Sequence, residues 1–245
     1  MNKENWKERT ELLIGNENIE RLENSHVLVV GLGGVGAYAA ESLCRAGVGE
    51  LTIVDGDLIH PTNKNRQLIA LESTMNKPKA EILGARLLDI NPTLKLHVIQ
   101  EYIKDERMIE ILDKPFDYVV DAIDTLSPKV FLIYHSVQKG LKVVSSLGSG
   151  ARLDPTRIKI VDLSKSYNCR LGFLLRKRLR KLGVTKGVKV VFSEDKADEN
   201  AVIVDEPGKN KKSTVGTISY MPPIFGCFCA SVVIQALIEN KITGE

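Results

Sequence analysis

A glycine-rich turn directly after an apolar strand constrains the fold of this chain more than any other feature. The apolar residues 27–30 predict a strand, and the sequence Gly-Leu-Gly-Gly-Val-Gly follows at 31–36. Asp55 comes 19 residues after the last of these glycines, behind a second apolar run. In such a unit, backbone N–H groups hold a phosphate and the later acid binds a ribose hydroxyl. The candidate nucleotide-binding residues of this unit are Gly31, Gly33, Gly34, Gly36 and Asp55.

Short apolar strands alternate with helical segments over the first 150 residues. One or two short helices are expected within 4–21. The expected strands are 27–30, 51–54, 94–100, 118–122 and 142–145. The expected helices between them are 35–46, 77–89, 108–112 and 127–139. This alternation predicts a Rossmann-like, mainly parallel sheet with helices on both faces. Ligands of such sheets bind beyond the carboxyl ends of the strands.

The pattern changes after Gly148-Ser149-Gly150. We expect strands at 157–163 and 188–193, a basic helix within 164–183 and a charged polar loop at 194–213. The apolar run 218–238 is interrupted by prolines, which leave a helix of about 15 residues, too short to span a bilayer. A buried helix and no membrane contact are therefore expected. The predicted units are an N-terminal helical segment (1–25), a nucleotide-binding core (26–163), a basic insertion (164–215) and a C-terminal segment packed on the core (216–245).

The composition is that of an ordinary globular protein. The chain has 245 residues, 43% hydrophobic and 27% charged, and its net charge of +3 does not by itself require a nucleic-acid partner. The four cysteines form no Cys-x-x-Cys pair, which favours free thiols in a reducing cytoplasm and gives no zinc ligands. The four histidines show no ligand spacing, so we expect structural or surface roles for them.

The residues after the glycine turn favour a triphosphate over a dinucleotide. A dinucleotide pyrophosphate is satisfied by backbone amides and the helix dipole, whereas a triphosphate usually recruits basic side chains and a divalent cation. Arg66 and Lys79 could supply the positive charge, and Asp124 could bind Mg²⁺. Asp57 could touch the same ion or order its loop. A nicotinamide-dependent dehydrogenase, the alternative for this turn, needs none of these side chains.

Together these motifs resemble the ubiquitin-activating (ThiF/MoeB/HesA-like) superfamily of enzymes that adenylate carboxylates. The resemblance rests on the glycine turn, Asp-x-Asp at 55–57, Asn-x-Asn-Arg-Gln at 63–67, Lys79 and Asp-x-x-Asp at 121–124. It implies ATP as cofactor, catalytic roles for Arg66, Lys79 and Asp124 with Mg²⁺, and a homodimer in which Arg9 reaches the partner's γ-phosphate. The further nucleotide-binding candidates are Asp57, Asn63, Asn65, Arg66, Gln67, Lys79 and Asp124.

A narrower resemblance, to the tRNA threonylcarbamoyladenosine dehydratases, extends over most of the chain. It adds Leu-Asp-Pro-Thr at 153–156 and Pro222-x-x-x-Gly226. It implies ATP-dependent cyclisation of threonylcarbamoyladenosine in tRNA through an acyl-adenylate, with a sulfur-transfer protein as a further candidate partner. The alternative is adenylation of the C-terminus of a small sulfur-carrier protein. Relatives with that activity usually carry two Cys-x-x-Cys zinc pairs, which this chain lacks. A third alternative is a non-enzymatic scaffold that binds ATP.

The segment 170–181 combines six cations with no acid. Its leucines share one helical face, so the plain interpretation is a solvated amphipathic helix. A surface of one sign also suits a phosphate backbone, and the dehydratase resemblance favours contact with tRNA over a membrane surface. The candidate tRNA-binding residues are Arg170, Arg176, Lys177, Arg178, Arg180 and Lys181, with Lys186, Lys189, Lys209, Lys211 and Lys212 as extensions.

Overall fold

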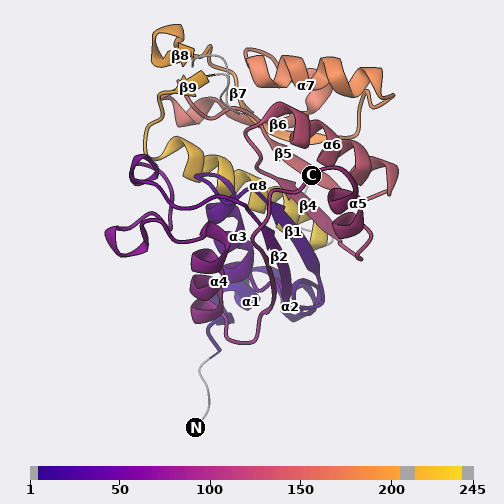
Figure 1. Ribbon diagram of the computed structural model, residues 1–245. Coiled ribbons are helices and arrows are strands. Elements are labelled where there is room, and N and C mark those ends of the chain that lie inside the picture. The colour runs from indigo at the N-terminus through magenta and orange to yellow at the C-terminus, as the bar shows by residue number, and fades with distance from the viewer. Residues whose placement is uncertain (1–4, 205–212, 239–245) are drawn as a thin grey trace.

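The computed structural model describes residues 5–204 and 213–238, which form a sheet covered by helices on both faces (Figure 1). The main sheet has seven strands in the order β3-β2-β1-β4-β5-β7-β6. Their bounds are β1 His26–Val30, β2 Glu50–Val54, β3 Lys95–Ile99, β4 Tyr118–Asp121, β5 Val143–Ser146, β6 Ile158–Asp162 and β7 Lys189–Ser193. The α-helices are α1 Glu8–Ile14, α2 Asn16–Glu23, α3 Gly36–Ala46, α4 Lys79–Ile90, α5 Asp105–Leu112, α6 Leu126–Gln138, α7 Arg170–Lys181 and α8 Met221–Leu237.

Neighbouring strands of the sheet run parallel from β3 to β7, and β6 alone pairs antiparallel to its neighbour β7. The chain order reverses between β1 and β4, because β2 and β3 extend the sheet on one side and β4 and β5 on the other. Such a reversal opens a crevice at the carboxyl ends of the two central strands, where ligands bind in open α/β sheets. The predicted Rossmann-like, mainly parallel sheet is confirmed.

Two apolar clusters, one on each face, hold the helices to the sheet. One cluster joins α3, α4 and α8 to the sheet, with the fully buried Leu43, Leu83 and Phe225 among its members. The other joins α5, α6 and α7, with Leu132 and Leu175 fully buried. The expected buried C-terminal helix is α8, which lies beside α3. No helix in the described part of the chain is both long and apolar enough to span a membrane.

The region after residue 163 differs from the expectation in two ways. β7 lies inside the main sheet between β5 and β6, so the segment 164–215 contributes a strand to the core sheet. The stretch expected as a polar loop at 194–213 contains β8 Val202–Val204, which pairs antiparallel with β9 Ser213–Val215. The loop prediction was wrong there because the β-branched residues of β8 pair across the sequence with β9 despite their polar surroundings.

Candidate functional site

The glycine turn lies at the carboxyl end of β1, beside the crevice where the strand order reverses. Gly31 adopts φ +87° and donates its N–H to the Val54 carbonyl at 2.8 Å. A Cβ at Gly36 would stand 1.7 Å from the Gly31 carbonyl oxygen, and one at Gly34 would stand 2.9 Å from Pro222 Cβ. Only glycine fits at these two positions, because the turn folds closely against its own backbone and against α8.

Asp55 bonds back to this turn from the end of β2. One carboxylate oxygen accepts the Leu32 N–H at 2.6 Å and the other accepts the Asp57 N–H at 2.8 Å. Burial raises the pKa of Asp55 above its ordinary value, although Lys79 and these two N–H donors act against that rise. The carboxylate is thus fixed beside the glycine turn, as a ribose ligand requires.

Asp57 is held in an ion pair with Lys79, the first residue of α4. Lys79 Nζ lies 2.7 Å from Asp57 Oδ2, and the Tyr102 hydroxyl donates to Asp57 Oδ1 at 2.5 Å. The Lys79 side chain is only 5% exposed. Of the two readings of Asp57, these contacts favour loop ordering over binding of a metal ion. They also place the buried ammonium group of Lys79 next to the loop that carries Asp55.

The side chains of the segment 63–67 have different roles: Asn63 bonds within its own loop, and Arg66 packs against the glycine turn. The amide oxygen of Asn63, which is buried, accepts the His60 N–H at 3.0 Å, so this residue shapes the segment. Arg66 Cγ would lie 3.2 Å from a Cβ at Gly34. Burial lowers the pKa of Arg66, and the charge of Asp124 opposes this change, which shows that the guanidinium group lies in the field of that carboxylate.

Two further residues of this segment were predicted to bind nucleotide. Asn65 donates to the Thr217 carbonyl at 2.8 Å and accepts from Arg66 Nη1 at 2.7 Å, which aligns the guanidinium group. Gln67 is buried, and its Oε1 has no hydrogen-bond partner in the described structure. Its Nε2 would lie 3.6 Å from a Cβ at Gly33, so the amide borders the phosphate turn.

The loop after β4 is fixed by a buried ion pair that the sequence did not reveal. Lys129 and Asp121 are both fully buried, with Lys129 Nζ 2.8 Å from Asp121 Oδ2. Lys129 also donates to the Ile123 carbonyl at 2.9 Å, while Asp121 Oδ1 accepts the Ile123 N–H at 3.1 Å. Ser145 on β5 donates to Asp121 Oδ2 at 2.7 Å. The peptide of Ile123 is thereby clamped on both sides, one residue before the exposed Asp124.

A second basic residue outside the predicted set, Arg152, orders the loop after β5. Its guanidinium group is buried and donates to the carbonyls of Gly148 and Gly150 at 2.9 and 3.1 Å, and to that of Asn168 at 2.8 Å. It therefore ties the glycine loop at the carboxyl end of β5 to the segment that leads into α7. The sequence indicates this role only by placing a basic residue two positions after Gly150.

The two cysteines of α8 differ in exposure. Cys229 is fully buried, and burial raises the pKa of its thiol to about 12, which disfavours the thiolate form. Cys227 is exposed. The two thiols therefore differ in their access to solvent, although only Phe228 stands between them in the sequence.

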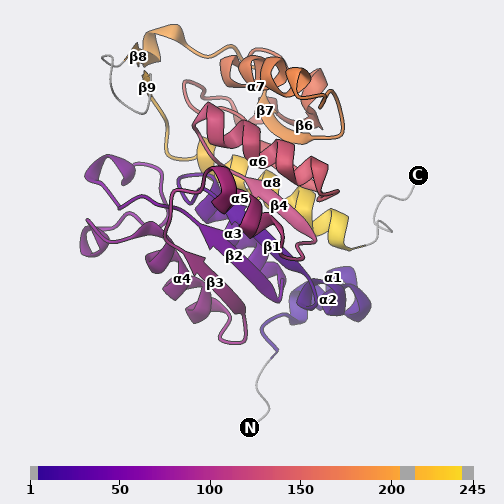
Figure 2. The same ribbon diagram turned by 45° about the vertical axis from the view of Figure 1, so that its right-hand side comes forward.

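The basic helix α7 lies beside α6 (Figures 1 and 2). Leu175 and Leu179 are fully buried, which confirms the predicted amphipathic arrangement. Arg178 Nη1 donates to Ser127 Oγ at 2.9 Å, and Ser127 is three residues after Asp124. Arg176 is half-buried and bonded to Ser166. The remaining predicted tRNA-binding cations are exposed: Arg170, Lys177, Arg178, Arg180 and Lys181. Lys209, Lys211 and Lys212 lie outside the described residues.

Arg9 lies away from the glycine turn of its own chain. It is exposed on α1, and α2 that follows packs at the amino ends of the strands, where the Gly49 N–H donates to the Leu22 carbonyl at 3.0 Å (Figure 2). The glycine turn lies at the opposite, carboxyl ends. The structure brings together the turn, Arg66 and Asp124, but it does not bring Arg9 to them.

Comparisons with known proteins agree with this geometry. The family model described as ThiF family matches residues 8–244. The chain is 36% identical over 239 residues to the tRNA threonylcarbamoyladenosine dehydratase of Bacillus subtilis, covering 95% of this chain and 94% of the relative. It is 35% identical over 240 residues to the enzyme of that name from Haemophilus influenzae, covering 92% and 90%.

The same relationship is evident in three dimensions. The crystal structure of Escherichia coli tRNA N6-threonylcarbamoyladenosine dehydratase, TcdA, in complex with ATP superposes with a TM-score of 0.86 at 31% identity. The match covers 97% of this chain and 96% of the E. coli chain. The family model and the relatives each span nearly the whole molecule, from α1 to α8. The chain therefore belongs to the ThiF family.

Proposed function

We propose that this protein is an ATP-dependent tRNA threonylcarbamoyladenosine dehydratase. The modified nucleoside carries a free carboxylate, which attacks the α-phosphorus of ATP and displaces pyrophosphate. A nitrogen of the same modification then attacks the activated carboxyl carbon, a ring closes and AMP leaves. The nucleoside loses one water in total, and ATP becomes AMP and pyrophosphate. The two steps require alignment and charge stabilisation, with no obligatory protein nucleophile.

One observation carries the proposal: the glycine turn, Arg66 and Asp124 converge where the strand order reverses. The turn offers backbone donors to the phosphates, and Arg66 adds a planar guanidinium group that suits phosphate oxygens. Asp55 is placed for the ribose, and Lys79 for a phosphate if its ammonium group exchanges part of its bond to Asp57. Nearly full-length similarity to three dehydratases, one of them bound to ATP, supports the same activity.

Asp124 is the residue that would hold Mg²⁺. Its carboxylate is exposed in the loop after β4, in the field of Arg66. A single carboxylate next to phosphate oxygens fits the way Mg²⁺ usually binds at nucleotide sites. When bound, the ion would neutralise charge on the phosphates during displacement.

The sulfur-carrier alternative has less support. The activating enzymes for such carriers usually bind a zinc ion through two cysteine pairs, and this sequence contains no such pairs. A carrier C-terminus also gives no role to the basic surface of α7. The two candidate functions share the adenylation chemistry and differ in the substrate, which is a modified tRNA nucleoside in one and a protein C-terminus in the other.

The decisive experiment is mass spectrometry of nucleosides from threonylcarbamoylated tRNA after incubation with the protein and Mg-ATP. We expect the modified nucleoside to lose the mass of one water, only when ATP is present. Digestion must be mild because the cyclic product hydrolyses easily. No change in mass, together with pyrophosphate exchange that depends on a carrier-protein C-terminus, would move the activity to the sulfur-carrier class.

We further propose that the exposed face of α7 binds the tRNA backbone. The second half of the helix lies beside the loop that carries Asp124, because Arg178 is bonded to Ser127, and Phe173 on the same helix is 56% exposed. An exposed aromatic ring among cations can stack on an unpaired base. A basic surface continuous with the site would hold the anticodon arm while its modified nucleoside enters the crevice.

Reversing three exposed charges of α7 tests this surface. The triple variant Lys177→Glu, Arg180→Glu and Lys181→Glu should bind tRNA more weakly, with a salt slope smaller by about 0.9 for each lost phosphate contact. ATP affinity should not change. The matched control is Lys95→Glu, Lys114→Glu and Lys142→Glu, which changes the net charge equally at the amino ends of the strands. Equal loss of tRNA affinity in both triple variants would contradict a tRNA-binding role of α7.

We also propose that the protein is a homodimer in the cytoplasm. A homodimer in which Arg9 enters the partner's site is supported by the distance of α1 from its own glycine turn and by Leu12 and Leu13, which are 82% and 78% exposed. A cytoplasmic location suits a tRNA substrate. A partnership with a sulfur-transfer protein rests on the family resemblance alone.

A further inference from the structure

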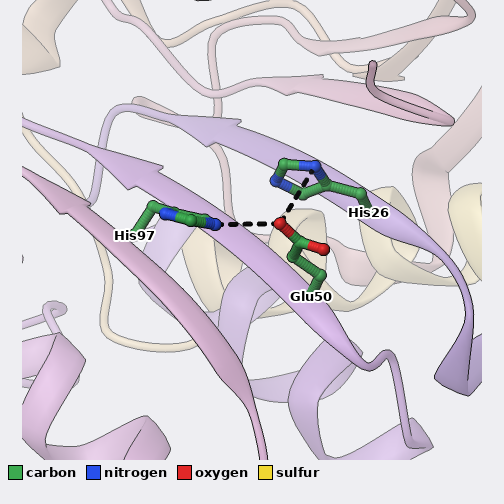
Figure 3. A group of neighbouring side chains, drawn as sticks. All are labelled: His26, Glu50 and His97. Carbon is green, nitrogen blue, oxygen red and sulfur yellow. Dashed lines mark hydrogen bonds and ion pairs between the residues drawn. The ribbon is translucent and has the colours of Figure 1, made fainter. Parts of the chain in front are cut away.

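Three side chains with metal-ligating atoms meet at the end of the sheet opposite to the nucleotide crevice. His26 and Glu50 are the first residues of β1 and β2, and His97 lies in the middle of β3. Figure 3 shows the carboxylate of Glu50 between the two imidazole rings. The three side chains come from three adjacent parallel strands, since His26 is in register with Glu50, and Thr52 with His97. The sheet itself therefore sets their spacing.

The donor atoms already have nearly the separation that a zinc ion requires. Glu50 Oε1 lies 2.8 Å from His97 Nε2 and 3.5 Å from His26 Nδ1, and one donor atom from each of the three residues falls within 4.8 Å of the others. Donor atoms around a tetrahedral zinc, each about 2.0–2.1 Å from it, are separated by roughly 3.3 Å. Two imidazoles and a carboxylate are a common zinc ligand set, with water in the fourth position.

The surroundings of His26 also suit a metal ligand. Its Nε2 is hydrogen-bonded to the Thr52 hydroxyl at 2.8 Å, and such an outer contact orients a ligating imidazole. The ring packs against Phe116 with 4.5 Å between centroids.

The site has an open side for the ion to enter and a favourable charge. The His97 side chain is 46% exposed and that of Glu50 29% exposed, whereas that of His26 is 11% exposed. Glu50 supplies the negative charge, and Asp117, which accepts the His26 backbone N–H at 2.8 Å, adds to it nearby. Lys95 is the neighbouring cation that opposes binding.

From this geometry we propose that His26, Glu50 and His97 form a site for a divalent transition metal, with zinc as the expected ion. The bound ion links β1, β2 and β3 at their amino-terminal half, far from the ATP crevice, and acts as a structural brace. The assignment is independent of the dehydratase activity, because none of the three residues lies in the nucleotide site.

The test is metal binding by the full-length protein without an affinity tag, after removal of metals with a chelator and in the absence of ATP. Titration with Co²⁺, followed by its visible absorption and then by competition with Zn²⁺, should show one site per chain. His97→Ala and Glu50→Gln should each weaken zinc binding by more than about tenfold. Zinc should also raise the melting temperature of the natural protein but not that of His97→Ala.

Two control variants separate this cluster from adventitious sites. His60→Ala removes another exposed histidine and Cys227→Ser removes the exposed thiol, and both should bind zinc as the natural protein does. Equal zinc affinity in His97→Ala and the natural protein would overturn the proposal. Loss of binding in Cys227→Ser would overturn it as well, by moving the ion to the thiol.

Discussion

Replacing Arg66 with alanine is expected to slow formation of the acyl-adenylate by about 10²–10³-fold, the usual cost of removing one donor that stabilises charge in a transition state. The aliphatic stem of Arg66 lies against Gly34 of the phosphate turn, and its guanidinium group lies in the field of Asp124. It is also preoriented, because Nη1 donates to Asn65 Oδ1 at 2.7 Å and to the Thr62 carbonyl at 3.0 Å. Preorientation means that little entropy is lost when the phosphates arrive.

The measurement is ATP–pyrophosphate exchange with threonylcarbamoylated tRNA, with kcat and KM determined separately. A loss concentrated in kcat places the contact in the transition state, and a rise in KM alone places it in ground-state binding. Arg66→Lys keeps the charge but loses the planar fork, so it should fall between alanine and the natural enzyme. Arg45→Ala is the matched control, because Arg45 forms a surface ion pair with Glu41 on α3. Unchanged exchange in Arg66→Ala would contradict a role of Arg66 in stabilising the phosphates.

The arrangement of the sheet was predictable because each of its signals is local. The short strands, the helices between them and the glycine turn all lie within short windows of sequence. The helix expected at 35–46 is α3, which ends before Gly47, whose φ is +102°. The pairing of β8 with β9 was missed because it depends on contacts across a charged segment, where composition alone indicates a loop.

The site was predictable only where its residues follow one another in a motif. The glycine turn, Asp55 and the segment 63–67 belong to such motifs, and the structure gathers most of them at the carboxyl edge of the sheet. Their roles in catalysis stay predictions. Lys129 could not be assigned, because a lysine in an apolar helix usually extends to solvent and its partner Asp121 is a strand residue. The grouping of His26, Glu50 and His97 could not be predicted either, because the histidines show no ligand spacing in the sequence. Strand register, which one sequence does not reveal, brings them together.

The second large effect is expected from Lys129→Met, which leaves the Asp121 carboxylate buried without its ion pair. Breaking a fully buried pair by removing one partner costs about 3–5 kcal/mol. For a chain of this size, that corresponds to a fall in melting temperature of roughly 6–20 °C, at about 2–4 °C per kcal/mol. The measurement is thermal and denaturant unfolding of the protein without nucleotide.

A surface lysine at the end of the same helix gives the matched control. Lys139 follows α6 and pairs with the exposed Asp113, so Lys139→Met should cost no more than about 1 kcal/mol. The double variant Lys129→Met with Asp121→Asn should recover part of the stability, because no unpaired buried charge remains. Equal stability of the two single lysine variants would contradict the structural role of the buried pair.

Lys129 should also affect catalysis, through the position of Asp124. Its ammonium group holds the Ile123 carbonyl at 2.9 Å, and the Ile123 N–H is held by Asp121, so loss of the lysine frees one side of that peptide. We expect the Mg²⁺ concentration for half-maximal rate to rise in Lys129→Met, measured well below its melting temperature. Lys129→Arg, which keeps a cation but enlarges it in a close-packed site, should restore the Mg²⁺ dependence only in part. A variant that loses stability but keeps the Mg²⁺ dependence of the natural enzyme would confine Lys129 to folding and separate the buried pair from the reaction.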